Sequence, residues 1–228
     1  MALRLATWNC FRGDPGERLS ELASLRPDVV CLQEVAAPQQ LIPNSIYRAQ
    51  TSVQGVLLWA REDLLLTAVA EERANGNRAL AFLGAAMGVG LAGVWAQSEP
   101  SYTRDVLGSL EAARMALGSV PLIFLGDFNA SPPLSRGGAE HAKLVATLEE
   151  DGLCSAYHRA RQEDFGAESH PTFYWQWKEA QPFHLDYCFV PEEWASLISS
   201  VEVGGFAEFS SSDHRPVLVE LDVDVAAI

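Results

Sequence analysis

Polar side chains that could do chemistry stand beside short apolar segments of this chain. The segments 3–8, 28–32 and 120–125 run into such residues, and the later segments 184–190 and 216–223 begin beside others. Isolated carboxylates and carboxamides next to buried strands are costly unless they are paired or bind a metal. The residues concerned are Asn9, Glu34, Asp127, Asn129, Asp186, Asp213 and His214.

Polar residues at several strand ends predict that these residues share one binding site. In layered α/β folds, strand-end positions converge on one rim, where ligands bind. Carboxylates, amides and a histidine on one rim form a hard-oxygen site suited to Mg²⁺ or Mn²⁺. Taken alone, Asp127 or Asp213 is as typical of a turn or a cap, and His214 is as typical of an ordinary packed or surface histidine. The order and spacing of the whole set favour the metal site.

Five motifs along the chain resemble one known superfamily. They are TWN (7–9), LQE (32–34), GDFN (126–129), LDY (185–187) and SDHRP (212–216). In this order they resemble the endonuclease/exonuclease/phosphatase superfamily, which includes deoxyribonuclease I, exonuclease III, sphingomyelinases and inositol polyphosphate phosphatases. The resemblance extends over residues 5–220, and GDFN followed by SDH is its most specific part. It implies an α/β fold, a four-layer α/β sandwich with two central mixed β-sheets flanked by helices.

The resemblance also implies a divalent-metal site, with Mg²⁺ or Mn²⁺ as the cofactor. Glu34 is then the principal metal ligand, and Asn9 sits beside the metal. Asp213 is a further metal-side or water-orienting carboxylate. A divalent ion in such a site offsets the charge of a phosphodiester and lowers the pKa of bound water.

Four further residues acquire catalytic roles from the same resemblance. Asp127 orients or deprotonates the attacking water, and Asn129 holds that water or a phosphate oxygen. His214 meets the scissile phosphate, and Asp186 fixes its tautomer. A histidinium in that place stabilises the five-coordinate phosphorus or protonates the leaving oxygen.

Two positions depart from the pattern of the nuclease members. Phe11 stands where many of them carry an acidic residue. Trp95, or alternatively Gln97, aligns with a position that is often His or Tyr, and a Trp cannot act as an acid. Protonation of the leaving group, where the reaction requires it, therefore falls to His214 or to metal-bound water.

Aromatic and basic residues near the motifs are candidate substrate contacts. In the aromatic segment 172–177, Trp175 either stacks on a base or a hydrophobic head group, or packs inward with its neighbours. Trp95 is a further candidate. Arg78 is either a bidentate phosphate contact or a solvated surface residue. Relatives often carry Arg at the position of His184, which makes His184 a candidate second phosphate contact. Two other arginines are candidates on the same ground as Arg78, namely Arg104 and Arg215.

The elements that must position these residues alternate between strand-like and helical patterns. Asp14 and Pro15 predict the start of a helix, with apolar residues continuing at helical spacing to Leu25. Further helices are predicted over 103–117 and 139–151. Additional apolar segments, typical of strands, cover 54–60 and 64–70. Because no linker or internal repeat interrupts the pattern, we predict a single domain over residues 1–228.

The charge balance limits how this chain can bind phosphate. Among 228 residues, 16 Lys and Arg stand against 30 Asp and Glu, a net charge of −14. Proteins that hold nucleic acid along an extended basic face are usually strongly basic, so this mode is excluded. A metal and a few arginines can still bind phosphate. We therefore expect a phosphate-ester substrate, with any nucleic acid bound locally.

The uncharged segment 79–98 is long enough to span a membrane, but four glycines interrupt it. Two buried strands joined by a glycine-rich turn fit it better. The four cysteines lack a C-x-x-C spacing and are typical of small buried side chains in a reducing compartment. With no signal-peptide pattern at the start, we expect a cytoplasmic protein without a membrane span, a monomer rather than an oligomer.

These observations favour a divalent-metal-dependent phosphoesterase that hydrolyses phosphodiester bonds with metal-activated water, with a nuclease as the first hypothesis. A phosphatase or phosphodiesterase acting on a small or lipid-derived phosphate is the alternative enzyme class. A third alternative is a member that kept the fold and lost its activity. The intact set of polar residues argues against this third alternative.

Overall fold

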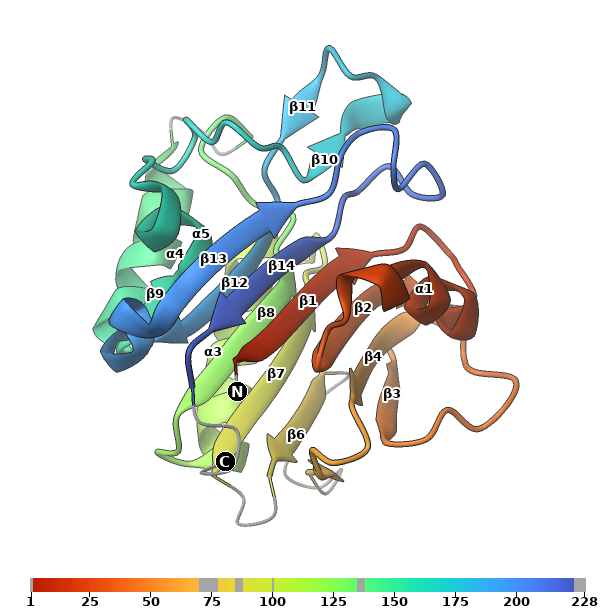
Figure 1. The fold of residues 1–228 in the computed structure, drawn as a ribbon. Helices are drawn as coiled ribbons and strands as arrows, with labels where there is room; N and C mark the ends of the chain where they lie inside the picture. Colours follow the sequence, from red (N-terminus) through yellow and green to blue (C-terminus); the bar gives the residue numbers. More distant parts are fainter. Residues whose placement is uncertain (1, 70–77, 85–87, 100, 135–137, 224–228) are drawn as a thin grey trace.

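The computed structural model describes residues 2–69, 78–84, 88–99, 101–134 and 138–223. Their strands form two six-stranded sheets and a separate two-stranded hairpin (Figure 1). The sheets pack face to face, and helices cover both outer faces. The predicted four-layer α/β sandwich with two mixed sheets is therefore confirmed.

The first sheet has the N-terminal strand near its centre. It consists of β1 (Leu3–Asn9), β2 (Val29–Val35), β3 (Ser45–Ala49), β4 (Gly55–Ala60), β13 (Ile198–Val203) and β14 (Val217–Leu221). Their order across the sheet is β13-β14-β1-β2-β4-β3. β1 pairs parallel with β2 and antiparallel with β14, so that the end of β1 lies beside the start of β14.

The second sheet is built in the same mixed way. It consists of β5 (Leu66–Ala68), β6 (Ala79–Leu83), β7 (Val89–Trp95), β8 (Leu122–Asp127), β9 (Leu153–Ser155) and β12 (Asp186–Pro191). Their order is β5-β6-β7-β8-β12-β9. β7 runs parallel to β8, and β12 pairs antiparallel with β8, so the end of β8 lies beside the start of β12.

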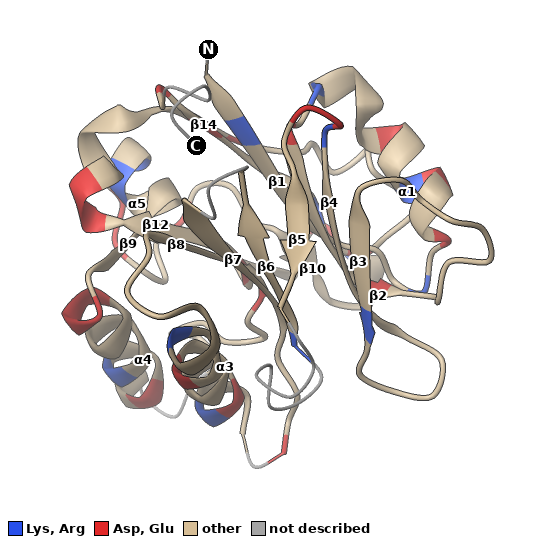
Figure 2. Cartoon of the chain, turned by 90° about the horizontal axis from the view of Figure 1, so that it is seen from below, with Lys and Arg blue, Asp and Glu red and all other residues tan. Residues whose placement is uncertain are grey.

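Helices form the two outer layers. α1 (Pro15–Leu22) and the 3₁₀ turn Ala23–Leu25 lie on the first sheet, and α3 (Tyr102–Leu117) and α4 (Ala139–Glu150) lie on the second. The short helix α5 (Ala156–Arg161) contacts β12 and β13. Figure 2 shows many of the charged residues on these helices and few on the strands between them. The layers thus separate a charged exterior from apolar sheet faces.

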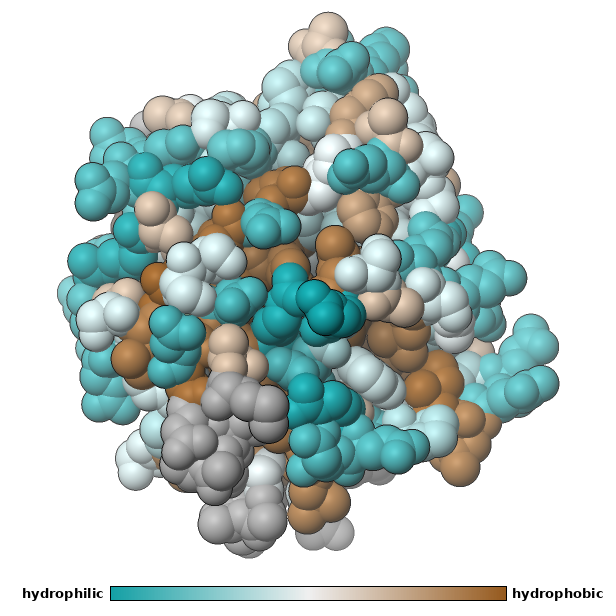
Figure 3. All heavy atoms as spheres, in the orientation of Figure 1, coloured by the Kyte–Doolittle hydropathy of each residue, from teal (hydrophilic) through white to brown (hydrophobic). Residues whose placement is uncertain are grey.

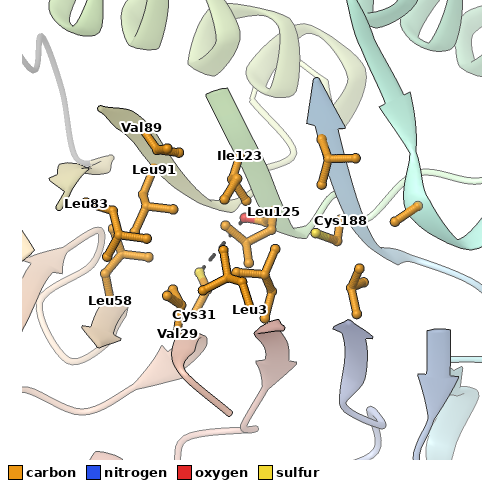
Figure 4. Close-up of a cluster of buried hydrophobic side chains, with 14 of the residues drawn as sticks. Leu3, Val29, Cys31, Leu58, Leu83, Val89, Leu91, Ile123, Leu125 and Cys188 are labelled. Atoms are coloured by element: carbon orange, nitrogen blue, oxygen red, sulfur yellow. Dashed lines mark hydrogen bonds between the residues drawn. The ribbon is translucent and has the colours of Figure 1, made fainter. Parts of the chain in front are cut away.

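An apolar core fills the space between the two sheets. Figure 4 shows side chains such as Leu58 of the first sheet facing Leu83 and Leu91 of the second. The Sγ of Cys31 lies 3.9 Å from the carbonyl oxygen of Leu125 across this space. All four cysteines are buried and free, and burial raises the pKa of the Cys31 thiol to about 12. They act here as small apolar side chains, as expected.

The uncharged segment 79–98 forms two paired strands of this core. β6 and β7 pair antiparallel, and the turn predicted between them includes residues 85–87, which lie outside the described residues. Within the described part of the chain, none of the helices is both long enough and apolar enough to cross a membrane.

On the face shown in Figure 3, hydrophobic residues form separate groups among hydrophilic ones.

Most predicted elements lie within a few residues of their expected positions. The carboxylate of Asp14 accepts hydrogen bonds from the backbone N–H groups of Gly16 and Glu17, which confirms it as the cap of α1. The strand predicted over 64–70 is reduced to β5, whose residues are largely exposed, and residue 70 lies outside the described residues. The sequence pattern did not predict β3 and β13, because their residues alternate only weakly between buried and exposed.

Gly126 determines how closely β7 and β8 approach each other just before Asp127. Its φ is +146°, and a Cβ atom at this position would lie 1.9 Å from the carbonyl oxygen of Val94 in β7. A side chain there would collide with backbone rather than with a flexible neighbour. Glycine is therefore required beside Asp127 for steric and conformational reasons.

We expect Gly126→Ala to lower the free energy of unfolding by about 3 kcal/mol or more, because the strands must separate to admit the methyl group. Urea denaturation followed by circular dichroism would measure this loss. Gly138→Ala is the matched control, since Gly138 lies in the left-handed region with a φ of +77° and a ψ of −9°, and the nearest atom to an added Cβ is 3.9 Å away. It should cost only about 1 kcal/mol, and an equal loss in both variants would contradict the steric explanation.

Candidate active site

The polar residues singled out in the sequence meet at one edge of the two sheets. Asn9 ends β1, Asp127 ends β8, and Asp186 begins β12 directly opposite Asp127. His214 lies just before β14, and Glu34 lies near the end of β2. In Figure 1 this edge lies where β1 ends, below the hairpin labelled β10 and β11. Pairing within each sheet and the stacking of the sheets together produce this convergence.

The amide of Asn9 connects two of the carboxylates. Its Nδ2 donates to Oε1 of Glu34 at 3.1 Å and to Oδ2 of Asp127 at 2.9 Å. Its Oδ1 accepts a hydrogen bond from the backbone N–H of Phe11 at 3.1 Å. In this orientation Asn9 holds Glu34 and Asp127 close together, although they come from different sheets.

A β-bulge directs Glu34 into the site. The pairing between β2 and β4 shifts register between Leu32 and Val35, and Glu34 has a φ of +57°. A bulge of this kind turns a side chain that strict alternation would send to another face. Nε2 of Gln54 donates to Oε2 of Glu34 at 3.2 Å, so both carboxylate oxygens have amide partners.

Asp127 is enclosed by amide donors. The backbone N–H of Asn129 donates to its Oδ1 at 2.8 Å, and Nδ2 of Asn129 donates to its Oδ2 at 2.9 Å. Asn129 has a φ of +49°, a conformation that Asn tolerates better than most residues. Burial and the nearby charge of Asp186 raise the pKa of Asp127 to about 7, although His214 and the amide donors oppose this shift.

His214 and Asp186 form the predicted pair. Nδ1 of His214 lies 2.8 Å from Oδ2 of Asp186, and both side chains are buried. Burial favours the neutral imidazole, but the Asp186 carboxylate and its hydrogen bond outweigh burial and raise the pKa of His214 to about 9. The hydroxyl of Thr172 accepts hydrogen bonds from the backbone N–H groups of Leu185 and Asp186, which fixes the start of β12.

The donor set suits a hard cation. A ligand atom from each of Asp127, Asp186 and His214 lies within 4.8 Å of the other two. Oδ1 of Asp186 is buried and has no hydrogen-bond partner among the described residues. Within the described part of the chain, no Lys or Arg forms an ion pair with Glu34 or with these aspartates. Of the residues that the structure describes, His214 is thus the one cationic partner of these carboxylates, and a divalent cation is a further group that could offset their charge.

The residues predicted to bind the metal, Glu34, Asn9 and Asp213, lie outside the close group of Asp127, Asp186 and His214. Glu34 is linked to it through Asn9. Asp213 is half-buried, and burial raises its pKa, with the nearby charges of Glu34 and Asp186 acting in the same direction. The backbone carbonyl of Asp213 accepts a hydrogen bond from Tyr174 at 2.9 Å. Asp213 therefore lies next to the close group of three rather than within it.

The candidate arginines have structural partners. Nε of Arg78 donates to the hydroxyl of Ser109 at 2.6 Å, and its Nη2 lies 3.2 Å from a carboxylate oxygen of Asp105 in α3. Arg215 is 1% exposed, and its guanidinium donates to backbone carbonyls of the segment 206–214. Arg215 therefore supports the loop that carries His214, from the interior of the protein. Arg104 is exposed in the first turn of α3.

His184 and Trp95 are both buried next to the site. Nδ1 of His184 lies 2.9 Å from the carbonyl oxygen of His170, and its ring packs on Tyr157. Its Nε2 has no hydrogen-bond partner among the described residues. Trp95 pairs with Asp127 across β7 and β8, and its carbonyl accepts a hydrogen bond from the side chain of Gln50.

An aromatic hairpin lies beside His214. It consists of β10 (Phe173–Tyr174), the 3₁₀ turn Trp175–Trp177 and β11 (Pro182–Phe183), and it projects from the sheets in Figure 1. The ring of Phe173 lies 4.6 Å from the ring of His214, whereas Trp175 is 53% exposed. Tyr174 packs inward and Trp175 faces outward, and stacking of Trp175 on a substrate stays a prediction. A cavity of about 670 Å³ is lined by residues that include Phe173, Trp175, Phe183 and Asn129.

The sequence did not identify the supporting roles of Gln54 and Thr172. Gln54 precedes β4, and its amide donates to Glu34. Thr172 begins the aromatic segment, and its hydroxyl, rather than any aromatic ring, holds Asp186. Neither residue has a neighbour of unusual chemistry in the sequence, so only the fold reveals these contacts.

Comparisons with known proteins match this chain at the level of family and fold. The sequence model of the Endonuclease/Exonuclease/phosphatase family matches residues 6–214. A 3′ phosphatase from Neisseria, NExo, solved with a product DNA hairpin, is 19% identical with a TM-score of 0.74, over 97% of this chain and 100% of that one.

Two other solved structures have the same fold. The endonuclease domain of TRAS1, a telomere-specific non-LTR retrotransposon, is 19% identical with a TM-score of 0.73, over 97% of this chain and 99% of that one. An AP endonuclease from Archaeoglobus fulgidus is 17% identical with a TM-score of 0.68, over 97% of this chain and 100% of that one. A search of curated proteins found no match.

Thr172→Val should lower the free energy of unfolding by about 2–3 kcal/mol, because it leaves two buried backbone N–H groups without an acceptor. Thr172→Ser is the matched control, since it keeps the hydroxyl and removes one methyl group, at a cost of about 1 kcal/mol. Urea denaturation measures both. A loss in the Ser variant equal to that in the Val variant would show that the hydroxyl does not support β12.

Proposed function

Because the chain belongs to the Endonuclease/Exonuclease/phosphatase family, and is thus a phosphoester hydrolase, we propose that it is a metal-dependent phosphodiesterase acting on nucleic acid. The observation that carries this proposal is the convergence of Asp127, Asp186 and His214, with atoms within 4.8 Å of one another. A general base and a cationic imidazole thus stand side by side in a buried acidic site.

Glu34 would be the principal ligand of a divalent cation, with Asn9 and Asp213 beside it. Asn9 donates to both Glu34 and Asp127, and Asp213 interacts with Glu34 and Asp186 through its charge. When bound, Mg²⁺ or Mn²⁺ would offset the charge of the phosphate and lower the pKa of a water molecule. Both ions suit oxygen ligands, and the chain's own groups do not discriminate between them.

Asp127 is placed to accept a proton from the attacking water. Its pKa of about 7 lies near the pH at which a general base is most effective. The amides of Asn9 and Asn129 fix the direction of its carboxylate. These donors hold the base in place without a rearrangement during the reaction.

His214 is placed to meet the phosphate as a cation. Asp186 accepts from Nδ1 and keeps the ring protonated near neutral pH. The other ring nitrogen, Nε2, has no hydrogen-bond partner among the described residues, so it is available to donate to a phosphate oxygen or to the leaving oxygen. The Asp186 pairing thus sets both the charge and the direction of the imidazole.

The aromatic cavity favours a nucleic-acid substrate. Phe173, whose ring lies 4.6 Å from that of His214, and the exposed Trp175 both line it, so an unstacked base would find aromatic rings there. The solved neighbours named above include a phosphatase bound to a DNA hairpin. With a net charge of −14, binding would depend on contacts close to the cleaved bond.

The same acidity supports a second candidate, a phosphodiesterase acting on a small or lipid-derived phosphate. Two of the candidate arginines, Arg78 and Arg215, are held by protein groups and are not free to bind a long polyanion along the sheet edge. Such a substrate would need no extended contact.

Purified protein should hydrolyse bis-p-nitrophenyl phosphate in Mg²⁺ or Mn²⁺ and lose this activity in EDTA. We expect Asp127→Asn or His214→Ala to lower kcat by at least about a hundredfold, since each removes a group that acts on the reacting atoms. Asp222→Asn, an exposed aspartate far along the chain, is the control and should stay within about twofold of the wild type. Near-wild-type rates in both site variants would contradict the assigned roles.

A substrate panel distinguishes the two candidate functions. Single-stranded, duplex and abasic DNA and RNA are incubated with the Mg²⁺-loaded protein and examined on denaturing gels. Cleavage of any of these supports the nuclease, and Trp175→Ala should then weaken cleavage several-fold because a stacking surface is lost, worth about 1–3 kcal/mol per base. Intact nucleic acids together with rapid hydrolysis of small phosphate esters would instead identify the second candidate.

A further inference from the structure

A second, more polar pocket adjoins the candidate active site. It has a volume of about 330 Å³, and Asn129 lies in its wall as well as beside Asp127. Tyr102, Asn129 and Leu134 also line the aromatic cavity, so the two spaces are neighbours. Unlike the aromatic cavity, this pocket is lined by hydroxyl groups, from Ser98, Ser101, Thr103 and Ser131.

The N-terminus of α3 opens onto this pocket. Ser101 caps the helix, and its hydroxyl accepts from the backbone N–H of Arg104 while its carbonyl accepts from Asp105. The N–H groups of Tyr102 and Thr103 come before the first intrahelical donor and have no partner inside the helix. α3 is 16 residues long, so its aligned peptide dipoles place a partial positive charge at this end.

Ser131 is the independent sign that a ligand belongs here. The residue is 1% exposed and lines the pocket, yet its Oγ has no hydrogen-bond partner among the described residues. A buried hydroxyl without a partner costs free energy unless a ligand or an ordered water satisfies it. Ser131 comes from the segment after β8 rather than from α3, so the pocket has a donor from a second part of the chain.

Three acidic residues lie near the pocket, and they limit what it can bind. The Asp105 carboxylate is already engaged by Arg78 and by the backbone N–H of Gln97. Glu140 lines the pocket from the first turn of α4 and is exposed. Arg104 contributes an exposed positive charge in the first turn of α3. Glu99, which follows Ser98, is exposed as well, so the pocket would suit a hydrogen-bonded anion with two exposed carboxylates at its edge.

We propose that this pocket binds a second, non-scissile phosphate of the substrate. The inference rests on the proposed function and deepens it, since it makes the substrate a chain of nucleotides rather than an isolated phosphodiester. Asn129 then stands between the cleaved phosphate and its neighbour, with the intervening nucleoside against the aromatic cavity. Helix N-termini and hydroxyl groups are common partners of nucleic-acid phosphates.

Calorimetric titration tests the pocket without requiring turnover. The full chain is titrated in Ca²⁺, a hard cation that suits oxygen ligands, with thymidine 3′,5′-bisphosphate and, separately, with each thymidine monophosphate. We expect the bisphosphate to bind at least about fivefold more tightly than the better monophosphate, because only it reaches both phosphate positions. Equal affinities would overturn the proposal.

Three variants make the test specific to the pocket. Ser131→Ala should reduce the affinity ratio to below about twofold, and Glu140→Gln should increase it, because one removes a donor and the other a repelling charge. Ser119→Ala, an exposed serine at the other end of β8, should leave the ratio unchanged. A ratio that Ser131→Ala does not alter would also overturn the proposal. Failure of the proposed function would appear separately, as no metal-dependent hydrolysis of bis-p-nitrophenyl phosphate.

Discussion

Buried negative charge at the shared edge of two sheets is the constraint on which this structure depends. Asp127 and Asp186 are almost fully enclosed, and Glu34 lies beside them, without a lysine or arginine partner in the described chain. Carboxylates in such surroundings repel one another, so amides, backbone N–H groups and one imidazole must hold them. Burial first, and then the charge of Asp186, raise the pKa of Asp127, whereas the carboxylates around His214 raise its pKa against the effect of burial.

The sandwich supplies the rigidity that this crowding requires. β1 and β8 belong to different sheets, yet their ends are linked by the single amide of Asn9. The apolar layer between the sheets fixes the distance across which that amide must reach (Figure 4). Close packing of this kind transmits small displacements, so a change in the core would be felt at the carboxylates. Packing and chemistry are thus coupled through a few strand ends.

Strand-end patterning and motif order predicted the fold and the main polar residues, because Asp127, Asp186 and His214 each stand at a recognisable boundary in the sequence. Three features of the site could not be predicted from strand ends and motif order. The bulge at Glu34 depends on cross-strand register, which a single sequence does not express. The partners of Arg78 and Arg215 are distant or are backbone carbonyls. The hydroxyl of Thr172 acts on a strand that follows it by more than ten residues.

The bulge in β2 affects the direction of the Glu34 side chain more than it affects the stability of the fold. Side chains along a strand alternate strictly between two faces, so one inserted residue decides which face receives Glu34. Loss of one residue at this point would shorten the strand by a single step and leave its buried pairing with β1 intact, while the acidic group would turn away from the sheet edge. Descendants of this chain could therefore lose the chemistry in one genetic event and still be maintained as stable proteins.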